Sequence, residues 1–380
     1  MDKILFIENS ILPSRGGIEK VSQLLSDTFV QDGHLCYFAY WHTDNPLIGN
    51  DRKIRMDLTD SVQSFHARIS HFINKNGINI IINQGLTQRR IIYTLKKIKK
   101  QNPEIQVINC LHNTPYFINY IKNPTSLKDR IILLIKSILM RGNVYIKEQQ
   151  LIYSICDNYV VLSPHFIPEA KKVFHLCDDK KFKAIGNPQP FYHSSIAYNK
   201  QKTVLIVARF DENQKNLMSA LRIWKQVSSE ITDWKLQLIG YGEAELMYRQ
   251  YIQKNNIPNI SILGKKEEPL PYYQQASLFM MTSRYEGFGM TLIEALQNQC
   301  IPLAFHTFSA IDDIISDGKN GILIPPYDEN LYAKKMIELM RNESLINTYR
   351  RNASITLAQY SLDNIKEKWY SLFKEWKTRQ

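Results

Sequence analysis

Two acids and two glycines stand at fixed spacing in Ser283-Arg-Tyr-Glu-Gly-Phe-Gly-Met-Thr-Leu-Ile-Glu-Ala-Leu296. The apolar run 276–281 before this stretch predicts a buried strand, and residues 290–296 have helical spacing. When a strand is followed by a glycine-bearing turn and a helix, the unpaired N–H groups at the helix N-terminus point to the region beyond the end of the strand. Such a helix end is an anion site. With Glu286 and Glu294 on either side, the layout suits a phosphate-bearing ligand that also carries hydroxyl groups.

A second group of charges follows the predicted strand 204–209, in Arg209-Phe-Asp-Glu-Asn-Gln-Lys215. We interpret this stretch as a loop. Arg209 offers a rigid fork of donors and Lys215 a point charge, a pair suited to a diphosphate. A solvated loop with a surface ion pair is the alternative. Because the loop is expected at the same sheet edge as residues 283–296, ligand binding is favoured.

Glycines follow two other predicted strands. Gly240 comes after the strand 235–239, and Gly16-Gly17 come after the first strand of the chain. Glycine at a strand-to-helix turn either closes a tight turn or lets a ligand approach the backbone. Both readings stay open here, and neither site has the third glycine of a dinucleotide fingerprint.

His112 directly follows the apolar strand 106–111. A histidine at the carboxyl end of a strand can meet a substrate, and a satisfied structural histidine is an equal alternative. The other histidines show no spacing typical of a metal site.

The composition bounds the class of protein. A chain of 380 residues is long for one core and predicts two domains. Lys and Arg exceed Asp and Glu by 48 − 36 = 12, which favours an anionic partner, and no nucleic-acid-binding motif is present. The five cysteines have no close-paired spacing, which indicates reduced thiols in the cytosol. We expect no signal peptide and no run of the roughly 20 apolar residues that span a bilayer.

Two successive alternations of predicted strands and helices divide the chain at Gly186-Asn-Pro-Gln-Pro190. Such alternation is typical of doubly wound domains with parallel sheets, whose ligands lie at the carboxyl ends of the strands. We therefore predict an α/β fold with two Rossmann-like domains, residues 1–186 and 187–361, followed by a terminal helix within 362–380. A helix is also predicted at 310–315.

One basic and apolar segment, 128–141 with Lys122 before it, could lie as a helix on an anionic membrane surface. A helix that faces the core and carries a basic outer face is the alternative.

These residues resemble a known family. Glu286 to Glu294 resembles the Glu-x7-Glu motif of family-4 (group 1) retaining glycosyltransferases, and Asn320-Gly-Ile-Leu-Ile-Pro resembles the segment that follows it. The resemblance is strong over 204–327 and weaker over the first 186 residues. Further positions match features of the family: Ser283, Arg209, Lys215, Gly16, Gly17 and His112.

The resemblance implies the GT-B fold, in which two Rossmann-like domains face each other across a cleft. The first domain would bind the acceptor and the second the nucleotide sugar, while the helix within 362–380 would pack back on the first domain. No cofactor or metal is implied, because fixed cations replace the divalent ion of other transferases.

Individual roles also follow from the resemblance. Arg209 and Lys215 would hold the diphosphate, Glu286 the transferred sugar and Glu294 the ribose, while His112 would lie near the sugar and acceptor. The implied catalytic residues are Arg209, Lys215, Glu286 and His112. The implied donor-binding residues are Gly16, Gly17, Arg209, Lys215, Gly240, Ser283, Glu286, Gly287, Phe288, Gly289, Met290, Thr291 and Glu294.

We therefore predict a retaining, metal-independent hexosyltransferase in the cytoplasm, peripheral on the inner face of the membrane. A UDP-sugar is the preferred donor, and a lipid-linked glycan or surface polysaccharide precursor is the preferred acceptor. The nucleotide base, the sugar and the linkage stay open. Two alternatives are a non-catalytic nucleotide-sugar-binding protein of the same fold and an NAD(P)-dependent oxidoreductase, which the missing fingerprint disfavours.

The chain departs from the family pattern at three places. Ala208 replaces a glycine before Arg209, and Gln299 replaces a glycine after the motif helix. Phe308-Ser-Ala replaces a frequent Gly-Gly segment, with Asp312 or Asp313 as the following acid. We expect the loop at this last place to have a different shape.

Overall fold

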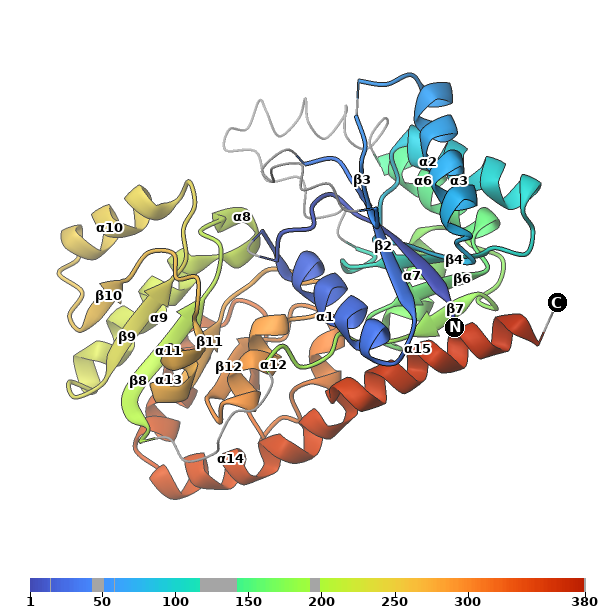
Figure 1. Ribbon diagram of the computed structural model, residues 1–380. Coiled ribbons are helices and arrows are strands. Elements are labelled where there is room, and N and C mark those ends of the chain that lie inside the picture. The colour runs from blue at the N-terminus through green and yellow to red at the C-terminus, as the bar shows by residue number, and fades with distance from the viewer. Residues whose placement is uncertain (14, 43–50, 58, 117–141, 192–198, 379–380) are drawn as a thin grey trace. The chain divides into compact units, whose positions relative to one another are not determined.

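The computed structural model describes residues 1–13, 15–42, 51–57, 59–116, 142–191 and 199–378. They form two compact units (Figure 1). The N-terminal unit is Met1–Pro188 together with Leu362–Gln380, and the C-terminal unit is Gln189–Ser361.

A seven-stranded sheet organises the N-terminal unit, in the order β3-β2-β1-β4-β5-β6-β7. All six neighbouring pairs are parallel, so the strands end at one common edge. Its strands are β1 (Lys3–Ile7), β2 (Leu35–Tyr40), β3 (Lys53–Arg55), β4 (Ile80–Asn83), β5 (Gln106–Leu111), β6 (Asn158–Val161) and β7 (Phe182–Ala184).

The helices of this unit connect the parallel strands. Local chemistry sets their ends: the hydroxyl of Ser61 accepts from the N–H of Ser64 at the start of α2, and Gly77 ends that helix at a φ of 62°. The connecting helices are α1 (Gly17–Gln31), α2 (Val62–Asn76), α3 (Arg89–Gln101), α6 (Gly142–Ile155) and α7 (Phe166–Val173).

The last helix, α15 (Leu362–Lys377), belongs to the N-terminal unit and contacts α1 there. Its Phe373 ring packs edge to face against Phe29 of α1 at 5.7 Å. The side-chain amide of Gln106 donates to the carbonyl of Leu372 at 3.2 Å. The residues that α15 buries are Ile365, Trp369, Leu372 and Phe373.

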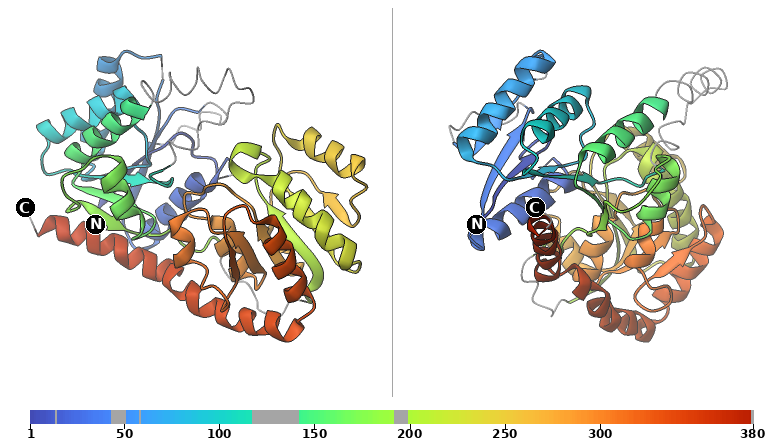
Figure 2. Two further views of the ribbon diagram at one scale, coloured as in Figure 1. Left: turned by 180° about the vertical axis from the view of Figure 1, so that it is seen from behind. Right: turned by 90° about the vertical axis from the view of Figure 1, so that its right-hand side faces the viewer.

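The C-terminal unit contains a six-stranded parallel sheet in the order β10-β9-β8-β11-β12-β13. Figure 2 shows its strands with helices on both faces. The strands are β8 (Gln201–Val207), β9 (Lys235–Ile239), β10 (Ile260–Ile262), β11 (Ala276–Met281), β12 (Ile301–Phe305) and β13 (Ile322–Ile324).

The core of the C-terminal unit lies between this sheet and α9 (Leu217–Glu230) and α13 (Glu329–Met340). Trp224 of α9 is fully buried, and its ring N–H donates to the carbonyl of Pro258 at 3.0 Å, so its one polar group is satisfied. The remaining helical elements are α8 (Glu212–Lys215), α10 (Glu245–Lys254), α11 (Leu270–Gln275), α12 (Met290–Gln297), α14 (Glu343–Leu357), η2 (Ser309–Asp313) and η3 (Ala358–Tyr360).

The two-sheet α/β fold is the predicted one, and two local predictions were wrong. Residues 209–215 are not a plain loop, because α8 forms within them, with the Asp211 carboxylate as its N-cap. The helix expected at 310–315 is instead a 3-10 helix over 309–313. The basic segment 128–141 and Lys122 lie outside the described residues, and none of the described helices is long and apolar enough to cross a bilayer.

Gln299 occupies a position that suits glycine, with a φ of 55° after the end of α12. We expect Gln299→Val to lower the unfolding free energy by about 1–2 kcal/mol, because a β-branched residue is strained in the left-handed region, while Gln299→Gly leaves it unchanged or higher. Chemical denaturation measures both. Gln253→Val at an exposed position of α10 is the control, and an equal loss there would contradict the role of the backbone angle.

Candidate active site

The carboxyl ends of β8 and β11 carry the charged residues singled out by the sequence. The two strands are parallel neighbours, so the segments that follow them meet at one edge of the sheet. There the Lys215 Nζ lies 2.6 Å from the Glu286 Oε1, and the Ser283 hydroxyl donates to the same oxygen at 2.7 Å. Both side chains of the ion pair are largely buried, with 15% and 10% of their surface exposed. The structure thus brings three predicted residues together.

Lys215 is positioned by the short helix α8. The Asp211 carboxylate accepts from the N–H groups of Asn213 and Gln214 at its start. At its end Asn216 is left-handed, with a φ of 50°, and its side-chain amide donates to the carbonyl of Thr282 at 3.2 Å. The end of α8 is therefore tied directly to the end of β11.

Arg209 joins the same cluster through Gln214. Its guanidinium donates to the Gln214 Oε1 at 3.1 Å, and the Gln214 amide donates to the carbonyl of Tyr285 at 3.4 Å. The backbone carbonyl of Gln214 also accepts from the N–H of Arg284 at 2.8 Å. Gln214 was not predicted as a site residue, although it bridges the two charged segments.

The N-terminus of α12 lies directly after these residues. Gly289 is its N-cap at a φ of 85°, and no described side chain caps the first N–H groups. A Cβ at Gly289 would lie 3.1 Å from the Leu292 side chain and 3.2 Å from the Phe308 ring, so a larger residue would be crowded as well as strained at this φ. Thr291 lines one small cavity with Lys215, Ser283 and Glu286. An anion at this cavity would meet both the helix end and the cation.

Glu294 stands in different surroundings from Glu286. It is largely buried in α12, and its Oε2 accepts from the hydroxyl of Tyr273 in α11 at 2.7 Å. Burial, with the neighbouring carboxylate, raises the pKa of Tyr273, so its hydroxyl keeps the proton and donates. The sequence reasoning missed Tyr273, because only the fold brings α11 against α12.

Other predicted donor-binding residues have structural contacts. A Cβ at Gly240 would lie 1.7 Å from the carbonyl of Ala208, so this glycine permits close packing between two loops. The Phe288 ring is buried edge to face against Tyr360 at 5.4 Å. Gly287 is buried beside it, and Met290 begins α12.

The remaining predicted residues belong to the N-terminal unit. Gly16 is the N-cap of α1 and Gly17 its first residue, at the carboxyl end of β1. His112 follows β5, where its Nε2 lies 2.6 Å from the side-chain oxygen of Gln84. Burial lowers the pKa of His112 to about 4, so the ring is neutral at pH 7.

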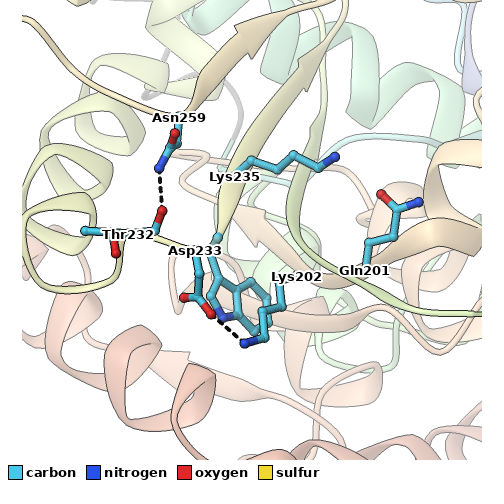
Figure 3. Close-up of a pocket in the computed structure, with 7 residues that line it drawn as sticks. Gln201, Lys202, Thr232, Asp233, Lys235 and Asn259 are labelled. Atoms are coloured by element: carbon cyan, nitrogen blue, oxygen red, sulfur yellow. Dashed lines mark hydrogen bonds and ion pairs between the residues drawn. The ribbon is translucent and has the colours of Figure 1, made fainter.

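A hollow of about 350 Å³ also lies in the C-terminal unit, at the opposite edge of the sheet (Figure 3). Its Lys202 and Asp233 form an exposed ion pair at 2.5 Å, and the Asn259 amide donates to the carbonyl of Thr232. Ligands of doubly wound sheets bind at the carboxyl ends of the strands, so this hollow is not the candidate site. Among the described residues no group of three or more His, Cys, Asp or Glu could hold a metal ion.

Comparison with known proteins identifies the unit that carries the charged cluster. Residues 190–355 match the model of the family described as glycosyl transferases group 1. The C-terminal unit is a group 1 glycosyl transferase domain.

Two curated glycosyltransferases resemble the chain. It is 30% identical over 226 residues to the amylovoran biosynthesis glycosyltransferase AmsD of Erwinia amylovora. This match covers 57% of the chain and 62% of that relative. It is also 22% identical over 330 residues to a glycosyltransferase of Campylobacter jejuni, named as the GalNAc-alpha-(1->4)-GalNAc-alpha-(1->3)-diNAcBac-PP-undecaprenol alpha-1,4-N-acetyl-D-galactosaminyltransferase. This match covers 83% of the chain and 90% of that relative. The chain thus spans less than two thirds of the Erwinia relative.

The fold matches solved structures over nearly the whole chain. HepE from Anabaena in complex with UDP superposes with a TM-score of 0.73 at 14% identity, over 98% of this chain and all of that one. This match confirms the GT-B fold predicted from the sequence.

The buried ion pair makes a stability prediction. Lys215→Met and Glu286→Gln should each lower the unfolding free energy by about 2–3 kcal/mol, because each leaves one largely buried charge without its partner. The double variant should recover most of this loss, since it leaves neither charge. A double-mutant cycle by chemical denaturation at pH 7 measures the coupling.

The exposed pair of Lys335 and Glu338 on α13, at 2.9 Å, is the matched control. Lys335→Met and Glu338→Gln should show no measurable coupling, because solvent screens the pair. Additive losses at Lys215 and Glu286 would show that their ion pair does not stabilise the fold.

Proposed function

We propose that the chain is a retaining, family-4 type glycosyltransferase that moves a hexose from a nucleotide diphosphate sugar to a hydroxyl group. The observation that carries the proposal is the buried group of Lys215, Glu286 and Ser283 beside the uncapped start of α12. A cation and a helix N-terminus recognise phosphate, and carboxylates recognise hydroxyl groups.

The diphosphate would lie against α12, with Arg209 and Lys215 as its cations. Lys215 is held by Glu286 in the structure. A diphosphate would compete for the Lys215 ammonium and so free Glu286 to accept from hydroxyl groups of the transferred sugar. Glu294, held by Tyr273, would accept from the ribose.

The reaction would proceed on one face of the sugar. The bond between the anomeric carbon and the phosphate oxygen breaks, the acceptor oxygen bonds to the same face of that carbon, and the acceptor proton passes to the leaving phosphate. Fixed positive charge at Arg209, Lys215 and the start of α12 would stabilise the departing diphosphate. This route uses neither a protein nucleophile nor a divalent ion.

The N-terminal unit would bind the acceptor. Of its residues, Gly16 and Gly17 would contact the donor, and His112 would lie near the sugar and acceptor. A lipid-linked glycan at the cytoplasmic face of the membrane is the preferred acceptor. The names of the two curated relatives support a role in polysaccharide or lipid-linked glycan synthesis, and the net charge of +12 favours an anionic surface. UDP is the preferred nucleotide, in keeping with the UDP-bound Anabaena structure.

A nucleotide-sugar panel tests donor binding. We expect one donor, a UDP-sugar, to raise the melting temperature of the purified protein, because a ligand that binds only the folded state stabilises it. Glu294→Ala should abolish the shift, and Tyr273→Phe should weaken affinity about 3–10-fold through loss of one hydrogen bond. Glu230→Ala, an exposed acid on α9, is the control. An unchanged shift in Glu294→Ala would contradict the ribose assignment.

Product analysis tests the chemistry. With the donor found in that panel and a lipid-linked glycan acceptor, NMR of the product should show the anomeric configuration of the donor, and turnover should persist in EDTA. Inversion would contradict the one-face mechanism, and loss of turnover that Mg²⁺ restores would contradict metal independence. Donor binding without transfer to any hydroxyl acceptor or water would support a binding protein instead.

A further inference from the structure

A row of buried polar side chains runs beneath the carboxyl edge of the N-terminal sheet. It connects His112, Gln84, Ser22 and Glu8, which we call the buried relay. The His112 Nε2 lies 2.6 Å from the Gln84 Oε1, and the Gln84 Nε2 donates to the Ser22 hydroxyl oxygen at 2.9 Å. The Ser22 hydroxyl in turn hydrogen-bonds the Glu8 carboxyl. These residues follow β1, β4 and β5, three adjacent strands, or lie on α1.

The donors and acceptors of the relay fix one proton on His112. Because the Gln84 Nε2 donates to Ser22, the amide oxygen faces His112, and an amide oxygen can only accept. In this direction of the relay the His112 Nε2 carries a hydrogen. In the neutral ring the other nitrogen, Nδ1, then has a lone pair.

Nδ1 of His112 is available to a ligand. It makes no hydrogen bond to any residue that the structure describes, and it is not among the buried polar atoms that lack a partner. The ring stays neutral at pH 7, because burial lowers its pKa to about 4. While Nε2 carries the hydrogen, Nδ1 is thus a hydrogen-bond acceptor at the carboxyl edge of the sheet.

Glu8, at the other end of the relay, is buried where the charged form of its carboxyl group is unfavourable. It is 2% exposed, and its Oε2 has no hydrogen-bond partner in the described part of the chain. Burial raises its pKa to about 8; Glu19 on α1 adds to the rise, while Ser22 on α1 and Lys53 on β3 oppose it. A glutamine would fill the same space without a buried charge. Groups placed at such a cost are concentrated at functional sites.

We propose that Glu8 is a positioning residue: once Glu8 is ionised, it sets through Ser22 and Gln84 which nitrogen of His112 carries the proton, and so leaves Nδ1 as the acceptor for a hydroxyl group of the bound nucleotide sugar. The role toward the sugar rests on the proposed glycosyl transfer. The control of the His112 proton does not.

The ionisation of Glu8 decides the direction of the relay. As a carboxylate it only accepts, so Ser22 donates to Glu8, Gln84 donates to Ser22 and His112 donates to Gln84. As a carboxylic acid it can donate to Ser22, and all the bonds can then reverse once the Gln84 amide turns over. The hydrogen of His112 would then sit on Nδ1, which becomes a donor and repels a hydroxyl hydrogen.

Imidazole ¹⁵N chemical shifts test the relay without any substrate, because they distinguish a protonated ring nitrogen from one with a lone pair. In protein labelled with ¹⁵N-histidine, with His112→Gln to assign the signals, the Nε2-protonated form should dominate at pH 9 and decline toward pH 6.5. Glu8→Gln should hold a mixture that does not change over this range, because an amide can both donate and accept. The same tautomer in both proteins at both pH values would overturn the proposal.

Kinetics test the consequence. With the donor and acceptor identified for the wild type, kcat/KM should rise with pH through the titration of Glu8, and Glu8→Gln should lose this rise and be about tenfold slower at pH 9, as expected for loss of one oriented hydrogen bond. Glu19→Gln should move the midpoint to lower pH and Lys53→Met to higher pH. If the midpoint is the same in Glu19→Gln, Lys53→Met and the wild type, the assignment of the titration to Glu8 is wrong.

Thermal unfolding shows whether the Glu8→Gln protein is folded and whether Glu8 titrates. The folded state holds the Glu8 proton more tightly than the unfolded state, so wild-type stability falls as pH rises from about 4.5 to about 8. Glu8→Gln lacks this loss, and its melting temperature should exceed that of the wild type increasingly toward pH 9. A constant difference across this range would overturn the assignment of the titration to Glu8.

The outcomes separate the two proposals. A pH-dependent tautomer in a protein that transfers no sugar would support the relay and contradict the proposed function. Sugar transfer by a protein whose His112 tautomer is the same in wild type and Glu8→Gln would support the proposed function and contradict the relay.

Discussion

The contact between Lys215 and Glu286 is the interaction on which the C-terminal site depends. Two residues that are 71 positions apart meet because β8 and β11 are parallel neighbours whose ends share one edge of the sheet. Because the pair is largely buried, removing either charge leaves the other one buried without its partner. The pair thus holds the segment after β8 against the segment after β11, and a diphosphate offers Lys215 a second anion in the same place.

Much of the architecture could be read from the sequence, because parallel strands buried on both faces appear as short apolar runs. The strands β5 and β9 were predicted with the bounds that the structure shows, and the helical spacing of residues 290–296 corresponds to α12. Two errors have physical causes. Four residues are too short for a periodic pattern to reveal α8, and its Asp211 cap was not recognised. At 310–315 the apolar spacing fits a helix, but the chain makes the tighter 3-10 helix over 309–313.

The candidate site was predictable where it depends on contiguous motifs, and not where it depends on tertiary contacts. Glu286, Ser283 and Lys215 were named from their motifs, and the structure places them together. Tyr273, Gln214 and three members of the buried relay (Gln84, Ser22 and Glu8) were missed, because each is an ordinary polar or charged residue in sequence whose role appears only when distant strands lie side by side. Gln299 shows the opposite case: a departure from a glycine pattern marked a backbone angle that the structure then shows.

The place of α15 has a consequence for synthesis of the chain on the ribosome. Phe29 emerges early, but its packing partners Trp369 and Phe373 are translated only after the whole C-terminal unit. The apolar face of α1 that α15 covers therefore stays exposed to water throughout translation. The nascent N-terminal unit must wait in a state that offers this surface to chaperones or to other unfinished chains.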